Sequence, residues 1–94
     1  MAQLSQVGKL ATTIRAEGDS TVVRYHSTDV VSFNARQVRL MTDGYLTSTT
    51  KARMNQASNQ FKLGYRVFQK RYRWYVSTPS GATLEFSDGV VFSR

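Results

Sequence analysis

Turn-forming residues divide this 94-residue chain into short segments, and this punctuation limits the folds that it can adopt. Clusters of Gly, Asp, Asn, Ser and Pro recur along it, for example at 17–20, 43–45 and 79–81. Between the clusters, apolar and polar residues alternate with a period of two, which predicts strands that bury one face. In the first half of the chain we expect a meander of three or four antiparallel strands, at 9–16, 21–26, 27–33 and 37–42.

One longer segment breaks the alternation and predicts a helix. Met54, Ala57 and Phe61 follow one another at spacings of three and four, as the buried side of a helix over 49–63 would. Hydroxyl side chains before it can accept from the first free amides of a helix, and Gly64 is placed for a left-handed C-cap. The candidate N-caps are Thr47, Ser48 and Thr49. We expect the helix to bury one narrow stripe and to expose its other face.

The second half of the chain predicts two hairpins. In the last one, we expect Phe86 to lie opposite Val90. Leu84 would then lie opposite Phe92, so that four apolar side chains gather on one face. The four strands are expected at 65–69, 74–78, 82–86 and 90–93.

Together these segments predict an α+β fold. We expect an antiparallel β-sheet of about six to seven short strands with one central α-helix at about 49–63, in the order β-β-β-α-β-β-β. Residues 9–94 are expected to form a single domain after a flexible N-terminus at 1–8. No apolar run approaches the roughly 18 residues of a membrane span, and no long apolar leader is visible, so we expect a cytoplasmic protein.

Positive charge is the strongest functional signal in the composition. The formal net charge is +7, from thirteen Lys and Arg against six Asp and Glu, and nine of the thirteen are Arg. Arg binds phosphate through two hydrogen bonds and stacks on aromatic rings, so this composition favours a polyanionic partner. The alternative is a basic protein whose charge has no anionic partner.

Catalytic and metal sites are not indicated. His26 is the one histidine, and its neighbours on a strand point to alternate faces, so they cannot converge with it as a catalytic triad. The absence of cysteine excludes thiolate ligands and disulfides, and the carboxylates have no metal-ligand spacing. We therefore expect no enzyme activity, no catalytic residue, no metal and no cofactor.

Several segments resemble a known family. They are "VVRYHSTDVVSF", "GYLTSTTKARMNQASNQFKLGYRVFQK", "WYV" and "DGVVF", within residues 21–92. Together they resemble a family of small uncharacterised proteins encoded mainly by phages and prophages, and "TSTTKARMNQ" (47–56) is the most specific part. The tip "KRYR" (70–73) departs from the Gly-containing turn that is usual there. The resemblance implies a phage setting, and hence the cytoplasm of a host cell, but it implies no activity and no site residues.

The helix is one candidate nucleic-acid interface. Arg53, Gln56 and Gln60 follow at spacings of three and four, so they would line one exposed stripe, with Lys51 beside it. Gln and Asn can pair with adenine and Arg with guanine, and no acid interrupts the face. We expect either a helix that enters a major groove or an ordinary solvated helix face.

The stretch "VFQKRYRWYVS" (67–77) is the other candidate. Pairing across its turn places Phe68 near Tyr75, with cations around them, and puts the core on the opposite face. Such a face can be a platform on which bases stack while cations meet phosphates, or it can be ordinary cross-strand packing. The predicted core residues are Tyr65, Val67, Trp74 and Val76. The full set of predicted nucleic-acid-binding residues is Lys51, Arg53, Gln56, Gln60, Arg66, Lys70, Arg71, Tyr72, Arg73 and Tyr75.

Three functions stay open at this point. The first is a small phage protein that binds DNA or RNA without catalysis. The second is a phage effector that binds and modulates a host or phage protein, for which the exposed pair Arg71 and Tyr72 is suited, since Arg and Tyr are enriched in interface hot spots. The third and weakest is a virion or assembly component that associates through its sheet edges.

Overall fold

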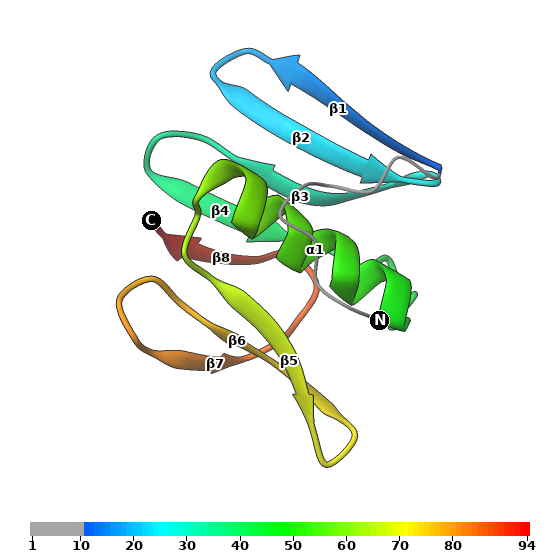
Figure 1. The fold of residues 1–94 in the computed structure, drawn as a ribbon, viewed down its shortest axis with the longest axis vertical. Helices are drawn as coiled ribbons and strands as arrows, with labels where there is room; N and C mark the ends of the chain where they lie inside the picture. Colours follow the sequence, from blue (N-terminus) through cyan, green and yellow to red (C-terminus); the bar gives the residue numbers. More distant parts are fainter. Residues whose placement is uncertain (1–10) are drawn as a thin grey trace.

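Two antiparallel sheets and one helix make up the described part of the chain (Figure 1). The computed structural model describes residues 11–94, so the predicted flexible segment 1–8 lies outside the described residues. The α+β class is confirmed, but the described residues form eight strands, which divide between two sheets instead of forming one. The elements are β1 (Thr12–Glu17), β2 (Ser20–Tyr25), β3 (Thr28–Phe33), β4 (Gln37–Leu40), α1 (Ser48–Phe61), β5 (Arg66–Lys70), β6 (Arg73–Ser77), β7 (Thr83–Glu85) and β8 (Val90–Ser93).

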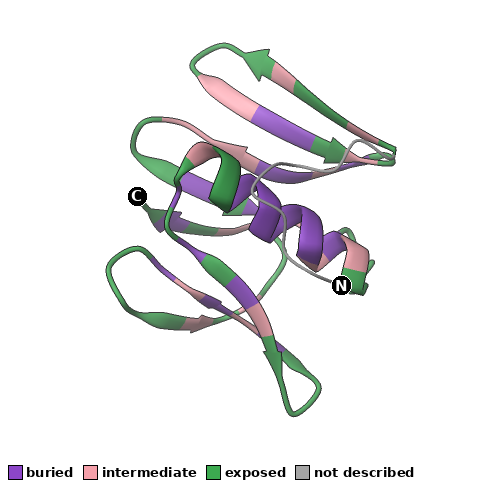
Figure 2. Cartoon of the chain, in the orientation of Figure 1, coloured by how far each residue is buried: buried purple, intermediate pink, exposed green. Residues whose placement is uncertain are grey.

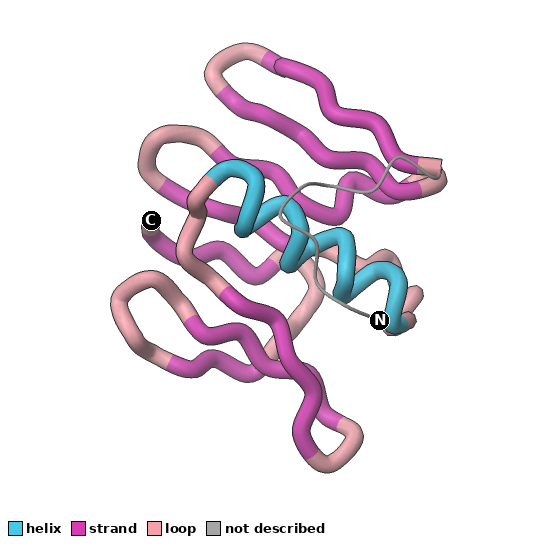
Figure 3. The backbone as a smooth tube through the Cα atoms, in the orientation of Figure 1, coloured by secondary structure: helices cyan, strands magenta, loops and turns pink. Residues whose placement is uncertain are grey.

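The large sheet has the strand order β1-β2-β3-β4-β8, and the small sheet has the order β5-β6-β7. The first four strands form the expected meander, in which each strand pairs with the next along the chain. Figure 3 shows the strands of the small sheet below the helix and the hairpin β5–β6 projecting away from the rest of the backbone. The two sheets therefore offer separate surfaces to solvent.

The predicted last hairpin does not form. β7 pairs with β6, with Leu84 opposite Val76, whereas β8 pairs with β4, with Phe92 opposite Val38. The chain crosses from one sheet to the other between them, and the carboxylate of Asp88 accepts hydrogen bonds from Thr42 at this crossing. The predicted pairing of Phe86 with Val90 was wrong because β7 pairs with the preceding strand β6, whereas β8 finds its partner β4 far away in the sequence.

Helix α1 lies between the two sheets and is buried on more than one side (Figure 2). The hydroxyl of Thr47 accepts from the amide of Thr50, which confirms one of the predicted N-caps. The helix ends at Phe61, and Lys62, not Gly64, is the left-handed C-cap. The prediction that only a narrow stripe is buried was wrong, because eight helical residues are buried. They are Thr50, Ala52, Arg53, Met54, Asn55, Gln56, Ala57 and Ser58.

One apolar core joins the two sheets through the helix. Val38 and Leu40 alternate with exposed residues in β4 and are fully buried, as their spacing predicted. Met54 of α1 is buried in the same cluster as Val67 and Val76 of the small sheet. Since a fully buried aliphatic side chain contributes about 1.5–3 kcal/mol, this shared core holds the small sheet against the rest of the chain.

Candidate nucleic-acid interface

The hairpin β5–β6 forms with the predicted register. Phe68 pairs with Tyr75 and Gln69 with Trp74, and the predicted core face is buried at all four positions. A period of two therefore leaves the intervening residues on the outer face of the small sheet. The buried residues are Tyr65, Val67, Trp74 and Val76.

The tip of the hairpin is a two-residue turn with an unusual sequence. Arg71 and Tyr72 both have positive φ, 52° and 68°, which is the pattern of a type I′ turn. Such turns favour Asn-Gly, because a side chain with a Cβ is strained in the left-handed region. Tyr72 is nevertheless 95% exposed. The tip thus presents an aromatic ring and a guanidinium to solvent on a strained backbone.

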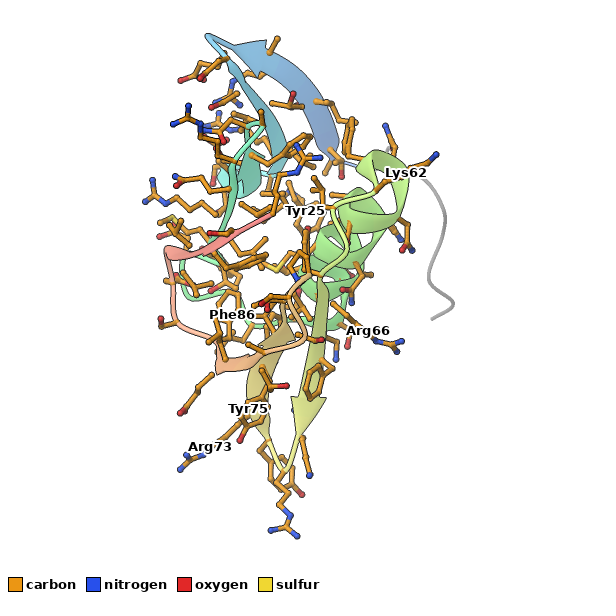
Figure 4. The ribbon with its side chains drawn as sticks, turned by 90° about the vertical axis from the view of Figure 1, so that its left-hand side faces the viewer. Tyr25, Lys62, Arg66, Arg73, Tyr75 and Phe86 are labelled. Atoms are coloured by element: carbon orange, nitrogen blue, oxygen red, sulfur yellow. The ribbon has the colours of Figure 1, made fainter. Side chains whose placement is uncertain are left out.

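The cations of the hairpin are exposed and poorly neutralised. Within residues 11–94, the one ion pair among them joins Arg73 Nη1 to Glu85 Oε1 at 3.7 Å, and both side chains are mostly exposed. An exposed pair at this distance contributes little, about 1 kcal/mol at most. Arg66 and Arg73 project to opposite sides of the view in Figure 4, which fits the strong twist of a two-stranded ribbon. The exposed cations are Arg66, Lys70, Arg71 and Arg73.

Two aromatic rings lie near Lys70 and Arg71 on the outer face. The rings of Phe68 and Tyr75 are stacked, with centroids 5.7 Å apart and planes at 24°. Both residues are half-buried and line an open hollow of about 510 Å³ together with Lys70, Arg71 and Thr83. We call this the outer hollow. No sequence signal pointed to Thr83, because its position here depends on the pairing of β7 with β6.

The predicted groove-reading stripe on the helix does not exist as an exposed surface. Gln56 is fully buried and Arg53 is 6% exposed. The guanidinium of Arg53 donates to Thr12 Oγ1 at 3.0 Å and to Gln56 Oε1 at 3.2 Å, and it lies 5.5 Å from the ring centre of Tyr25. The exposure predicted for Arg53 and Gln56 was wrong because these side chains connect α1 to the strands beside it.

Neighbouring polar side chains of the helix complete the edge of β5. Asn55 Nδ2 donates to the carbonyl of Val67 at 2.8 Å, and the amide of Val67 donates to Asn55 Oδ1 at 2.7 Å. One turn later, Ser58 Oγ makes the same pair of contacts with the backbone of Tyr65. These side chains take the place of a neighbouring strand, since β5 is the edge of the small sheet.

The remaining predicted residues of the helix lie apart from each other. Lys51 is half-buried with its Nζ 5.7 Å from the ring centre of Trp74, so it joins the helix to the small sheet. Gln60 is exposed near the other end of α1. The structure therefore gathers the hairpin residues of the predicted site and separates the helical ones.

A cavity of about 360 Å³ lies near the start of the helix. His26, Ser27 and Thr28 line it, along with hydroxyl and aromatic side chains, and none of its lining residues is Asp, Glu, Lys or Arg. Asp29 does not line the cavity. Its carboxylate instead receives Arg15 at 3.0 Å and Arg24 at 2.9 Å, and these hydrogen bonds hold its pKa below the usual value. The carboxylate of Asp29 is therefore bound by arginines and not by His26.

The described residues show no sign of a metal site or a membrane-spanning helix. No group of three or more His, Cys, Asp or Glu side chains in residues 11–94 could hold a metal ion. Among the same residues, no helix has the length and apolar character needed to cross a membrane. Most of the predicted residues that are exposed lie on the hairpin.

Comparison with known proteins supplies the lineage. A family model described as Kyanoviridae Gp96 protein matches residues 3–93. The chain belongs to the Kyanoviridae Gp96 family. Searches of curated proteins and of solved structures give no match. The predicted resemblance is thereby confirmed at the level of a phage family, here of cyanophages, and the description of the Gp96 family states no activity.

Proposed function

We propose that this Gp96-family chain is a non-enzymatic protein that binds DNA or RNA through the hairpin β5–β6 in the cytoplasm of the infected cell. The observation that carries the proposal is the cationic, aromatic outer face of the small sheet. Lys70 and Arg71 line the outer hollow together with the two stacked rings, and the four exposed cations of the hairpin meet one loosely paired acid among the described residues. Cations that meet phosphates, next to rings that can stack on bases, are the features of single-strand binding surfaces.

The contrast with the large sheet supports this assignment. There, Arg15 pairs with both Glu17 and Asp29, and Arg24 pairs with Asp29, at 2.9–3.0 Å. Acids on that sheet neutralise these arginines, whereas the hairpin keeps most of its charge available. A positive surface of this kind attracts polyanions over several ångströms of solvent.

Fluorescence anisotropy with labelled DNA and RNA, single- and double-stranded, tests the proposal. We expect micromolar binding near physiological salt. If three or four cations contact phosphates, the slope of log affinity against log salt concentration should be roughly −2 to −4. Absence of binding to every probe at low salt would overturn the proposal.

A matched pair of charge reversals locates the contact. The double variant R71E/R73E should lose at least about tenfold in affinity, because it removes phosphate contacts and adds repulsion. The double variant R36E/R39E changes the net charge equally at exposed positions of β4 and the turn before it, and should lose much less. Equal losses in the two variants would show that only the overall field matters.

A second candidate function rests on exposed apolar residues, two of which, Leu46 and Tyr72, line one hollow beside the hairpin tip. Tyr72, Tyr45 and Leu46 are 95%, 63% and 57% exposed. Exposed aromatic residues with an adjacent Arg are typical of protein interfaces, which favours an effector that binds a host or phage protein. A pull-down from host lysate treated with nuclease tests this candidate. A partner that survives nuclease and is lost in Tyr72→Ser supports it, and loss of all partners with nuclease contradicts it.

A further inference from the structure

A second hollow lies beside the tip of the hairpin and differs in character from the outer one. It has a volume of about 340 Å³ and is bounded by the hairpin tip, the start of the crossing to β8 and the segment 42–46. Aromatic and aliphatic side chains form much of its wall: Leu46, Tyr72, Trp74 and Phe86. The rings of Trp74 and Phe86 meet edge to face at 5.6 Å.

The two hollows are lined by different residues of the hairpin. Lys70, Arg71 and Tyr75 line the outer hollow, whereas Tyr72, Arg73 and Trp74 line the second. A chain that crosses the tip can therefore place one base on each side while its phosphates follow the cations. Bases are free to enter hollows only when they are unpaired, so this arrangement favours a single strand over a duplex.

The second hollow contains carboxylates, which the outer hollow lacks. Asp88 Oδ1 already accepts from the amide and the hydroxyl of Thr42, at 2.9 and 2.6 Å. Glu85 has only the loose pair with Arg73, and its side chain is 65% exposed. A carboxylate repels phosphate but accepts hydrogen bonds from the edge of a base. Arg73 also lines this hollow, but the two carboxylates outnumber this one cation, so the second hollow suits a base better than a phosphate.

We propose that the second hollow is a base subsite for single-stranded nucleic acid, in which Glu85 selects bases that carry an exocyclic amino group. Guanine fits best, because its N1–H and N2–H₂ lie side by side on one edge and can meet both oxygens of one carboxylate. Thymine and uracil fit worst, because two carbonyl oxygens flank their single N–H. The inference rests on the proposed function and adds a base preference to it.

Anisotropy with two short oligonucleotides tests this preference. One is an oligothymidylate of about twelve nucleotides, within the usual range of single-strand sites, and the other has two central guanines in the same sequence. We expect the guanine-containing strand to bind about five-fold more tightly. In Glu85→Gln the preference should fall to less than about two-fold, while affinity for oligothymidylate stays the same or rises, because a negative charge is removed.

Glu17→Gln is the matched control, since it removes one acid from the large sheet. It should leave the preference for guanine unchanged. Equal binding of the two strands by the natural chain, or a preference that survives in Glu85→Gln, would overturn the base subsite. Either result would leave the proposed function intact if R71E/R73E still weakens binding by at least about tenfold, whereas failure of both strands to bind would remove the proposed function itself.

Discussion

Helix α1 and the hairpin β5–β6 are both polar and cationic but have opposite environments. The helix has one Lys, one Arg and four amide side chains, the hairpin has three Arg and one Lys, and neither contains Asp or Glu. In the helix, Arg53, Asn55 and Gln56 are buried. Arg53 donates a hydrogen bond to Gln56, and Asn55 donates one to the backbone carbonyl of Val67. In the hairpin, Arg71 and Tyr72 meet solvent. Figure 2 shows the difference as a largely buried helix above an exposed hairpin tip.

The comparison shows that polarity alone does not identify a binding surface. A polar side chain can serve the backbone of another element when that element has an unpaired edge, and β5 is such an edge. The hairpin tip has no strand beyond it, so its polar groups remain available to a partner. We therefore expect substitutions in the helix to lower stability and substitutions at the hairpin tip to lower nucleic-acid affinity.

The largest expected effect is on stability, from Asn55→Ala. This change removes both hydrogen bonds to the backbone of Val67, whose amide and carbonyl are buried with that residue. Because each orphaned buried group costs about 1–3 kcal/mol, we expect the free energy of unfolding to fall by about 3 kcal/mol in urea denaturation. Gln69→Ala, an amide deletion at an exposed position of the hairpin, should change it by less than about 0.5 kcal/mol. A loss below about 1 kcal/mol for Asn55→Ala would mean that water completes the edge of β5.

Arg53→Ala and Arg71→Ala form a reciprocal test, since each removes one positive charge. Arg53→Ala should cost about 2 kcal/mol of stability, because buried hydrogen bonds of a charged group are lost, and should leave nucleic-acid affinity within about two-fold. Arg71→Ala should do the opposite, with a several-fold loss of affinity and a change in stability below about 0.5 kcal/mol. Urea denaturation and anisotropy on both variants check this. If Arg53→Ala and Arg71→Ala lose nucleic-acid affinity equally, the hairpin tip contributes no more to binding than the helix does.

Local sequence patterns predicted the elements well because their causes are local. The spacing of Val38 and Leu40 marked a half-buried strand, and the hydroxyl of Thr47 marked the helix start. The hairpin register followed from its turn, so the outer face with Phe68 and Tyr75 could be derived before the structure.

Features that depend on distant pairing could not be derived in this way. The turn at 87–89 is compatible with a hairpin, and nothing nearby indicates that β8 pairs with β4. The burial of Gln56 depends on two sheets that enclose one helix, which a seven-strand single sheet does not provide. The absence of Glu from α1 was a usable signal, since exposed helices often carry Glu–Lys pairs, but it indicated burial and not a groove-binding face.

The junction between helix and hairpin should be sensitive to alkaline pH. Tyr65 is buried, its hydroxyl donates to the carbonyl of Met54, and burial raises the pKa of its phenol. A raised folded pKa means that stability is complete below the unfolded value of about 10 and is lost as pH rises above it. We expect a loss of about 1.4 kcal/mol between pH 9 and pH 11 from this group alone. Tyr65→Phe has no phenol to ionise, so its free energy of unfolding lacks this pH-dependent loss. The free energy of unfolding of the natural chain should therefore fall by about 1.4 kcal/mol relative to that of the variant between pH 9 and pH 11. A constant difference across this range would show that the phenolate is tolerated at the junction.

A modest gain in stability is expected from replacing Arg71-Tyr72 with Asn-Gly. Both positions have positive φ, and Asn-Gly relieves the strain of two side chains in a type I′ turn. We expect about 1 kcal/mol of stabilisation, which raises Tm by about 4–8 °C in a chain of this size. The same variant should lose nucleic-acid affinity, because it deletes the guanidinium and the ring at the tip. A higher Tm with a lower affinity would mean that the natural tip sequence lowers stability and contributes to nucleic-acid binding, as strained segments at functional sites do. A higher Tm with full affinity would instead exclude the tip from the interface and leave the outer face of the sheet as the binding surface.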